Sequence, residues 1–382
     1  MSESSLSSKL RFAIVGCGVI HGTHVDAIKA LPGEAELVAV CDEAPELAQR
    51  TAEKHNVAAF SSLEEMLAKA DFDVLNVCTP SGLHAKHGVL GAKAGKHVVC
   101  EKPIDVSLAS ADALIGACET NHVKLVVISQ HRYTPGMQML KGYLDAGRLG
   151  ELCYGEAVTK WYRTQEYYDS GGWRGTWELD GGGALMNQGV HFVDQLRWMM
   201  GPVKSVSATM ATRAHERIEV EDIVSATIEF ESGAVGTLIA ATCMYPGYKQ
   251  MVEVYGTKGT VIVDGSRVRH AQFTDGREER GQHKLAAYPP EIKDFEVMTP
   301  APQTATGGAG DAKDEAASRG AAANPAMVAV GGHVAHLQDL IGAIRENRET
   351  FMNGREARAA LELIVGVYES ARTGKRVDFP LK

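Results

Sequence analysis

The 382-residue chain lacks the segments that mark membrane, secreted and nucleic-acid-binding proteins. No apolar run approaches the roughly 18–20 residues that a membrane-spanning helix needs. Residues 1–9 are polar and serine-rich, without the apolar stretch of a secretory signal, so they predict a short disordered tail. The formal net charge of -9 gives no electrostatic footprint for nucleic acid or an anionic membrane surface. We expect neither as a partner.

Paired cysteines and metal-ligand clusters are also missing. The seven cysteines are scattered and none forms a C-x-x-C pair, which argues against a disulfide framework and favours a reducing cytoplasm. His84 with His87, and His333 with His336, have spacings that could bind a metal. No cysteine or acidic partner clusters with them in the sequence, so we expect no metal.

The chain does contain an alternation of short apolar strands and helical stretches over residues 10–131. Near-continuous apolar strands separated by helices indicate a parallel sheet covered on both faces. We therefore predict an α/β fold that begins with a Rossmann domain, a doubly wound parallel sheet. The predicted strands are Leu10–Val15, Leu37–Cys41, Val74–Cys78, His97–Cys100 and Lys124–Ile128, and the predicted helices are Ala44–Lys54, Leu63–Lys69, His84–Ala94 and Leu108–Thr120.

The pattern changes in residues 132–382, which we predict to be a second, α+β domain for substrate binding and oligomerisation. Longer alternating strands flank short turns, as in Asp222–Glu231 with Ala234–Thr242 and in Met251–Tyr255 with Thr260–Val263. Such hairpins predict a large, mostly antiparallel open sheet. Residues 299–327 are rich in Ala, Gly, Pro and Thr and predict a mobile insert, and a final amphipathic helix is expected over Arg355–Thr373.

A glycine turn follows the first predicted strand. Gly16 permits a tight turn and Gly18 removes a Cβ that would block phosphates, so the backbone at Val19 and Ile20 can approach a pyrophosphate at the start of a helix. The third glycine of the usual motif is replaced by His21. Asp42 ends the second strand, where a carboxylate can bond the adenosine ribose and repel a 2′-phosphate. The predicted cofactor is NAD.

A lysine follows the fourth predicted strand, His97–Cys100, in the run Glu101-Lys102-Pro103. In a Rossmann sheet the strand order reverses between strands one and four, and ligands bind in that crevice. We therefore expect Lys102 beside the nicotinamide, where an ammonium can bond the substrate oxygen and stabilise alkoxide character.

Three polar residues lie at helical spacing after the glycines Gly181–Gly183. Asn187, His191 and Asp194 would share one face of a helix that runs to about Met200. Histidine titrates near neutrality and is the commonest general base, and Asp194 or Asn187 could orient it. An exposed polar stripe would give the same spacing.

These motifs resemble the glucose–fructose oxidoreductase/inositol dehydrogenase (Gfo/Idh/MocA) family. The resemblance rests on Gly16-Cys17-Gly18, Cys41-Asp42, Cys78-Thr79-Pro80 with His84, Gly95-Lys96-His97, Glu101-Lys102-Pro103, the Gly181–Asp194 block and the ending Tyr368–Lys375. It implies an N-terminal Rossmann domain and a C-terminal open sheet that packs against other subunits, as a homodimer or homotetramer. It also implies NAD(P)-dependent oxidation or reduction of sugars, inositols or sugar nucleotides.

The resemblance assigns roles to residues of this chain. Lys102 and His191 would be the catalytic pair. Many members have Asp where this chain has Asn187, and since Asn cannot relay a proton, it would orient substrate instead. The cofactor site would include Thr79, Pro80, His84, Glu101 and Lys102.

An aromatic segment, residues 161–177, holds three of the four tryptophans. Aromatic faces stack on sugars, and arginines bond hydroxyls or an anionic group. It resembles the family's dehydrogenases of UDP-N-acetylglucosaminuronic acid, although a free sugar would suit it too. With Lys102, Asn187 and His191, the predicted substrate-binding residues are Trp161, Arg163, Tyr168, Trp173 and Arg174.

Two alternatives to a dehydrogenase remain open at this point, because fold does not fix function. One is a non-catalytic NAD-binding sensor on the same fold. The other is an NAD-dependent enzyme that cleaves glycosides through transient oxidation.

Overall fold

The computed structural model describes residues 9–247, 249–276, 278–280 and 330–381, which form two compact units. The first unit comprises the described residues of Met1–Gln130, Glu178–Gly181 and Val328–Leu361, and the second comprises those of His131–Trp177, Gly182–Met327 and Glu362–Lys382. The predicted insert, residues 299–327, lies outside the described residues, as does the predicted tail except Lys9.

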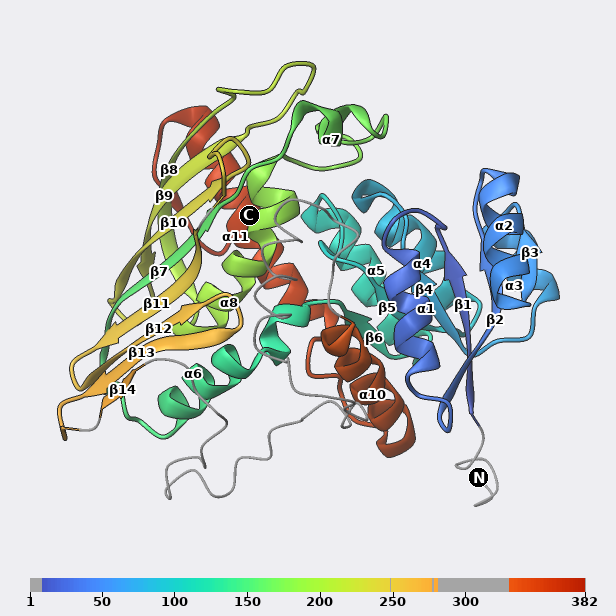
Figure 1. The fold of residues 1–382 in the computed structure, drawn as a ribbon, viewed down its shortest axis with the longest axis horizontal. Helices are drawn as coiled ribbons and strands as arrows, with labels where there is room; N and C mark the ends of the chain where they lie inside the picture. The colour runs from blue at the N-terminus through green and yellow to red at the C-terminus, as the bar shows by residue number, and fades with distance from the viewer. Residues whose placement is uncertain (1–8, 248, 277, 281–329, 382) are drawn as a thin grey trace. The chain divides into compact units, whose positions relative to one another are not determined.

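The first unit is built on a six-stranded sheet in the order β3-β2-β1-β4-β5-β6, in which every neighbouring pair is parallel (Figure 1). The side chains of β4 are buried on both faces, as expected for strands covered by helices on both sides. The predicted doubly wound sheet is confirmed. Its strands are β1 Leu10–Val15, β2 Ala35–Cys41, β3 Ala58–Phe60, β4 Val74–Val77, β5 His97–Cys100 and β6 Leu125–Val127.

Strand β3 corrects the predicted strand count. It has three residues, Ala58–Phe60, and too few apolar side chains to show a pattern in the sequence. The strand His97–Cys100 is therefore β5 rather than strand four, and the order reverses between β1 and β4. Lys102 therefore follows β5, which neighbours β4, and not one of the two strands, β1 and β4, between which the order reverses.

The four predicted helices of the first unit appear as α2 to α5, and the helix expected after the glycine turn is α1. A later helix of the chain, α10, also belongs to this unit. Helix α4 packs against α5, and α1 packs against α10, which the sequence had not assigned to this unit. The helices are α1 His21–Lys29, α2 Pro45–His55, α3 Leu63–Lys69, α4 His84–Lys93, α5 Leu108–Thr120 and α10 Gly331–Glu346.

The second unit holds, within the described residues, a nine-stranded sheet in the order β14-β13-β12-β11-β7-β10-β9-β8-β15. Among the strand pairs of this described sheet, only β10–β7 is parallel. The predicted, mostly antiparallel sheet is therefore confirmed, as are both hairpins, β9–β10 and β11–β12. The strands are β7 Leu152–Lys160, β8 Val203–Ala211, β9 Ile223–Phe230, β10 Val235–Ala241, β11 Lys249–Gly256, β12 Gly259–Asp264, β13 Arg267–Phe273, β14 Glu278–Arg280 and β15 Val377–Asp378.

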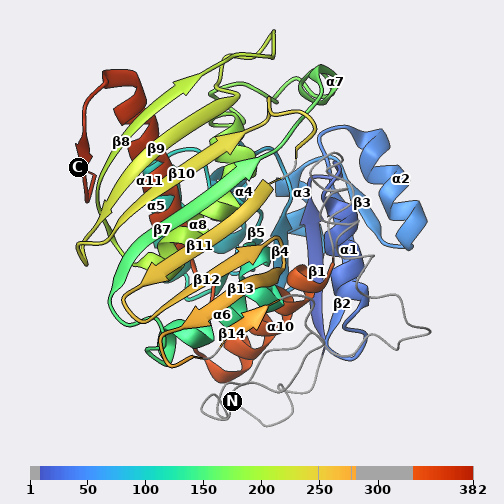
Figure 2. The ribbon, with the colours of Figure 1, turned by 60° about the vertical axis from the view of Figure 1, so that its left-hand side comes forward.

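Helices cover one face of this sheet. Helix α6, Pro135–Asp145, packs on β12 and β13, and α8, Val190–Met200, packs on β7 and β11. Figure 2 turns the opposite face forward, and no helix in the described part of the chain covers it. Helix α7 spans Gln165–Asp169. The expected final helix is α11, Gly354–Thr373, which begins in the first unit and ends in the second.

None of the helices among the described residues has the length and apolar character needed to cross a membrane.

Candidate active site

The glycine turn after β1 has the geometry that a dinucleotide needs. Gly16 has φ +95°, and a Cβ there would lie 2.6 Å from the carbonyl oxygen of Cys78, so this position requires glycine. Gly18 is exposed, and a Cβ built on it meets no atom within 4 Å. The space beside Gly18 and the exposed Val19, at the start of α1, fits a pyrophosphate.

The His21 ring bonds back to the Gly18 carbonyl oxygen across the turn, so the departure from the usual motif leaves the turn closed.

Asp42 holds this turn through hydrogen bonds to the backbone. Its Oδ2 accepts the Cys17 N–H at 2.7 Å, and its Oδ1 accepts the Ala44 N–H at 2.9 Å. An ionised carboxylate has about four lone-pair sites, so two stay available for ribose hydroxyls. The half-buried side chain therefore fits the adenosine end of NAD.

The four cysteines near the carboxyl ends of these strands are packing residues. Burial raises the pKa of the Cys17 thiol to about 11 and that of Cys41 to about 12, and it raises the pKa of Cys78 and Cys100 well above the usual value. All four thiols stay protonated near neutral pH, which excludes them as nucleophiles.

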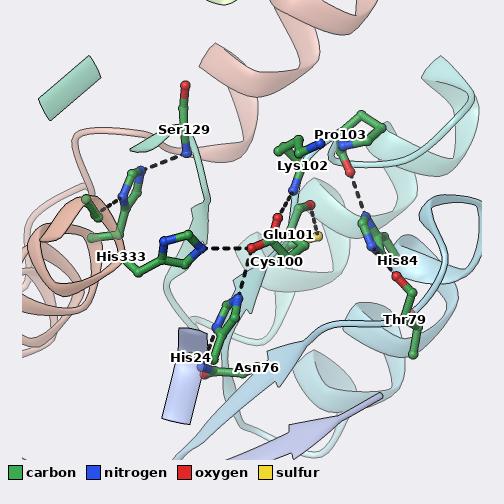
Figure 3. Close-up of polar contacts among 12 residues, drawn as sticks. His24, Asn76, Thr79, His84, Cys100, Glu101, Lys102, Pro103, Ser129 and His333 are labelled. Carbon is green, nitrogen blue, oxygen red and sulfur yellow. Dashed lines mark hydrogen bonds and ion pairs between the residues drawn. The ribbon is translucent and has the colours of Figure 1, made fainter. Parts of the chain in front are cut away.

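Lys102 is half-buried in the turn after β5, beside the buried carboxylate of Glu101 (Figure 3). Glu101 Oε1 accepts hydrogen bonds from the ring nitrogens Nε2 of His24 and His333, both at 3.0 Å. Burial alone would raise the pKa of Glu101, but these two donors outweigh it and hold the pKa well below the usual range. Glu101 is an ionised, buried anchor next to Lys102.

His84 connects the turn after β4 with the turn that carries Lys102. Its Nδ1 lies 2.7 Å from the Pro103 carbonyl oxygen and its Nε2 lies 2.9 Å from the Thr79 carbonyl oxygen (Figure 3). Burial lowers the pKa of His84 while the two carbonyls oppose that shift. Thr79 and Pro80 are half-buried, so the predicted cofactor residues of this unit gather along neighbouring turns.

His191 is the second residue of α8 and is 6% exposed. Its ring stacks on His131 with the centroids 4.6 Å apart. The sequence did not identify His131, because it lies 60 residues before His191 and outside every recognised motif.

Asn187 lies in a π-helical turn, Ala184–Gly189, rather than in the regular α-helix that the sequence predicted. Its Oδ1 accepts from Gln188 Nε2 at 3.2 Å. π-Helical turns occur frequently at functional sites. The shared face predicted for Asn187, His191 and Asp194 assumed an unbroken α-helix, but the regular helix α8 begins only at Val190, after Asn187.

A buried carboxylate holds the start of this π-helical turn. Glu221 accepts the Gly183 N–H at 2.9 Å, the Leu185 N–H at 2.8 Å and the Tyr368 O–H at 3.0 Å. A Cβ at Gly183 would lie 1.7 Å from the Glu221 carbonyl oxygen, so glycine is required for this approach. The sequence missed Glu221 because its partners lie 36 and 147 residues away.

Asp194 has a partner that the sequence did not predict. Its Oδ2 accepts from Arg132 Nε at 2.8 Å and its Oδ1 accepts from Arg132 Nη2 at 2.6 Å, and both side chains are buried. This bidentate ion pair ties α8 to the short helical turn Gln130–Tyr133. This pair gives Asp194 a role in anchoring α8, and the suggestion that Asp194 orients His191 stays a prediction.

The aromatic segment gathers two guanidinium groups around Tyr167. Arg174 Nη1 donates to the Tyr167 hydroxyl at 2.8 Å and lies over the rings of Tyr167 and Trp173, at 4.4 and 4.6 Å from Cζ to the centroids. Arg163 Cζ lies 4.9 Å from the Tyr167 centroid, and Gln188 Nε2 donates to the same hydroxyl at 3.0 Å. Burial lowers the pKa of Arg163. Two cations this close favour an anionic ligand.

The other predicted members of this segment differ in exposure. Trp161 and Tyr168 are 7% and 4% exposed, and the Tyr168 hydroxyl bonds Thr242 Oγ1 at 2.7 Å, so both help to support the loop. Trp173 is half-buried. Gln165, in the same segment, bonds Asp169 and the Glu216 backbone.

Family models match both units. The model described as "Oxidoreductase family, NAD-binding Rossmann fold" matches residues 10–129, and the "GFO/IDH/MocA C-terminal domain" matches residues 137–262. Inositol 2-dehydrogenase of Rhizobium meliloti is 30% identical over 272 residues, which are 70% of this chain and 79% of that protein.

Two solved structures cover nearly the whole chain. The WlbA dehydrogenase from Bordetella pertussis, in complex with NADH and UDP-GlcNAcA, is 34% identical with a TM-score of 0.81, and the match covers 98% of this chain and 100% of that one. The WlbA dehydrogenase from Chromobacterium violaceum, with the same two ligands, is 33% identical with a TM-score of 0.80 and coverage of 98% and 97%.

Proposed function

Because this chain belongs to the Gfo/Idh/MocA family of NAD-dependent oxidoreductases, which act on sugar-like alcohols, we propose that its substrate is a UDP-linked N-acetylhexosaminuronic acid. One observation carries the choice of an anionic sugar nucleotide: Arg163 and Arg174 flank Tyr167 within the aromatic segment. A uronate carboxylate or a pyrophosphate offers oxygens for such guanidinium groups. The likeness to the two WlbA dehydrogenases supports the same class.

The proposed reaction oxidises a secondary alcohol of the sugar to a ketone. The turn Gly16–Ile20 and the Asp42 carboxylate would hold NAD, which would supply the hydride acceptor for this oxidation. His191 takes the hydroxyl proton, and the Lys102 ammonium stabilises negative charge on the same oxygen. Asn187 orients the substrate, because its amide donates and accepts hydrogen bonds but relays no proton.

Replacing Lys102 tests this assignment. Lys102→Met should lower kcat by about 100-fold or more while the Kd for NAD, measured by fluorescence titration, stays within about twofold. Lys93→Met, at the exposed end of α4, is the matched control and should keep wild-type turnover. Near-normal turnover of Lys102→Met would reject the catalytic assignment.

The uncovered face of the second sheet is the proposed subunit interface. Val235 is 52% exposed there, and Tyr154, Thr237 and Glu156 form a half-buried hydrogen-bonded group on neighbouring strands. We expect a dimer or tetramer through this face. Thr237→Lys should shift the mass measured by light scattering toward the monomer, and an unchanged mass would place the interface elsewhere.

A reducing compartment, the cytoplasm, is the proposed location. All seven cysteines are free thiols, and five of them are buried. Cell fractionation should recover the protein with cytoplasmic markers.

A further inference from the structure

The Glu101 carboxylate holds the turn that carries Lys102. Glu101 Oε2 accepts the Lys102 backbone N–H at 3.1 Å, while Oε1 accepts from His24 and His333. His24 lies in α1, His333 in α10, and Glu101 directly after β5, all in the first unit. Figure 3 shows the two imidazoles converging on one oxygen from different elements.

The hydrogen-bond partners of His24 and His333 indicate which of their ring nitrogens carry protons. Asn76 Nδ2 donates to His24 Nδ1 at 2.9 Å, so His24 carries its proton on Nε2 and donates it to Glu101. Burial lowers the pKa of His24, which keeps the ring neutral. Glu101 is ionised and only accepts, so His333 also donates through Nε2, and its Nδ1 has no hydrogen-bond partner. Both histidines act as single donors.

The three ligand atoms lie within 4.8 Å of one another, and hydrogen bonds account for their close approach. A metal would need the lone pair of each Nε2, whereas the hydrogen bonds to Glu101 use a proton on each Nε2. The two Nε2 to Oε1 separations, 3.0 Å, are ordinary hydrogen-bond lengths. The structure thus supplies the acidic partner for His333 that the sequence did not reveal.

We propose that His24 and His333 are positioning residues for Lys102, acting through Glu101. Their two N–H groups orient the buried carboxylate, whose other oxygen sets the backbone of Lys102 and hence the direction of its ammonium. Misplacing a catalytic group by about 1 Å can cost on the order of 100-fold in rate. The inference rests on the proposed catalytic role of Lys102.

The test replaces each histidine in the full-length enzyme by leucine and by glutamine, with NAD and UDP-GlcNAcA as ligands. His24→Leu and His333→Leu should each lower kcat by about 10- to 100-fold, with KM and the Kd for NAD within about threefold. Glutamine keeps an amide N–H near the position of Nε2. His24→Gln and His333→Gln should therefore regain kcat to within about threefold of wild type.

His336→Leu is the control for burial in the same helix. His336 is fully buried, its Nε2 accepts the Ser129 N–H at 2.9 Å, and its Nδ1 lies 2.7 Å from the Gly332 carbonyl oxygen. It should lower the melting temperature as the other leucine variants do and leave the kcat of the folded protein unchanged.

Three results would overturn the inference. The first is a wild-type kcat in the folded His24→Leu and His333→Leu variants while Lys102→Met is inactive. This result would reject the positioning role of the histidines and leave the catalytic role of Lys102 intact. The second is an equal loss of kcat in the glutamine and leucine variants. The third is stoichiometric zinc in the purified protein that disappears in His333→Gln. An active Lys102→Met would instead reject the proposed function itself.

Discussion

Glu221 is a buried carboxylate at the start of the turn that leads to His191. Burial raises its pKa to about 7, although the N–H groups of Leu185 and Gly183 oppose the shift. An acid whose pKa is higher in the folded than in the unfolded protein stabilises the fold fully below the unfolded value of 4.5. That contribution is lost as the pH rises through about 7.

Glu221→Gln should therefore remove a pH dependence. Between about pH 4.5 and 7, the unfolding free energy of the wild type should fall relative to the variant, by up to about 3 kcal/mol. Urea unfolding at a series of pH values measures it. A wild-type stability that rises relative to the variant over this window would mean that the backbone donors, not burial, dominate.

Gly16 gives a second test at the scale of one residue. Its φ of +95° and the 2.6 Å approach of a built Cβ to Cys78 leave no room for alanine. Gly16→Ala should raise the Kd for NAD about tenfold or more and cost at least about 1–2 kcal/mol of stability.

Gly116 in α5 is the matched control, since a Cβ there meets nothing within 4 Å. Gly116→Ala should leave NAD affinity unchanged and raise stability slightly. Equal NAD affinity in the Gly16 and Gly116 variants would contradict the account of the turn.

The site residues that the sequence could predict are those whose roles follow from neighbouring residues in the chain. Gly16 and Asp42 follow directly from a strand, a turn and the next strand. Glu101 with His24 and His333 could not be found this way, because the bond to His333 joins residues 232 positions apart. Only the fold reveals such partners.

Helix α8 carries His191, and the Arg132–Asp194 pair anchors it. Both side chains are buried, so removing one partner leaves a charge without compensation. Arg132→Met should lower the unfolding free energy by about 3–5 kcal/mol. The double variant Arg132→Met, Asp194→Leu should recover most of that loss in urea titrations. A double variant as unstable as the single one would show that packing of the guanidinium over Trp198, not charge, is decisive.

Element boundaries were predictable where a serine caps the helix, as α3 and α5 show: each matches its predicted range, and each follows a serine whose side chain accepts a backbone N–H of the first turn. The three-residue strand β3 and the π-helical turn Ala184–Gly189 were not, because neither leaves a periodic pattern of its own. Missing β3 shifted the strand count, and the π-helical turn changed the spacing around Asn187.

For the whole molecule, the two sheets were predictable because parallel buried strands and alternating hairpins have different patterns. The sequence did not show that α10 packs in the first unit, because an apolar helix face does not reveal which element it packs against. That packing brings His333 to Glu101, so unit composition bears directly on the site.

The most direct test of the central claim is NADH formation from UDP-GlcNAcA by the purified protein. With NAD and this sugar nucleotide, NADH absorbance should rise, and Lys102→Met should reduce the rate about 100-fold or more. NADP in place of NAD should give a much slower reaction, because Asp42 repels a 2′-phosphate. Normal NAD binding without NADH from any sugar nucleotide, sugar or polyol would contradict the account and favour a non-catalytic role.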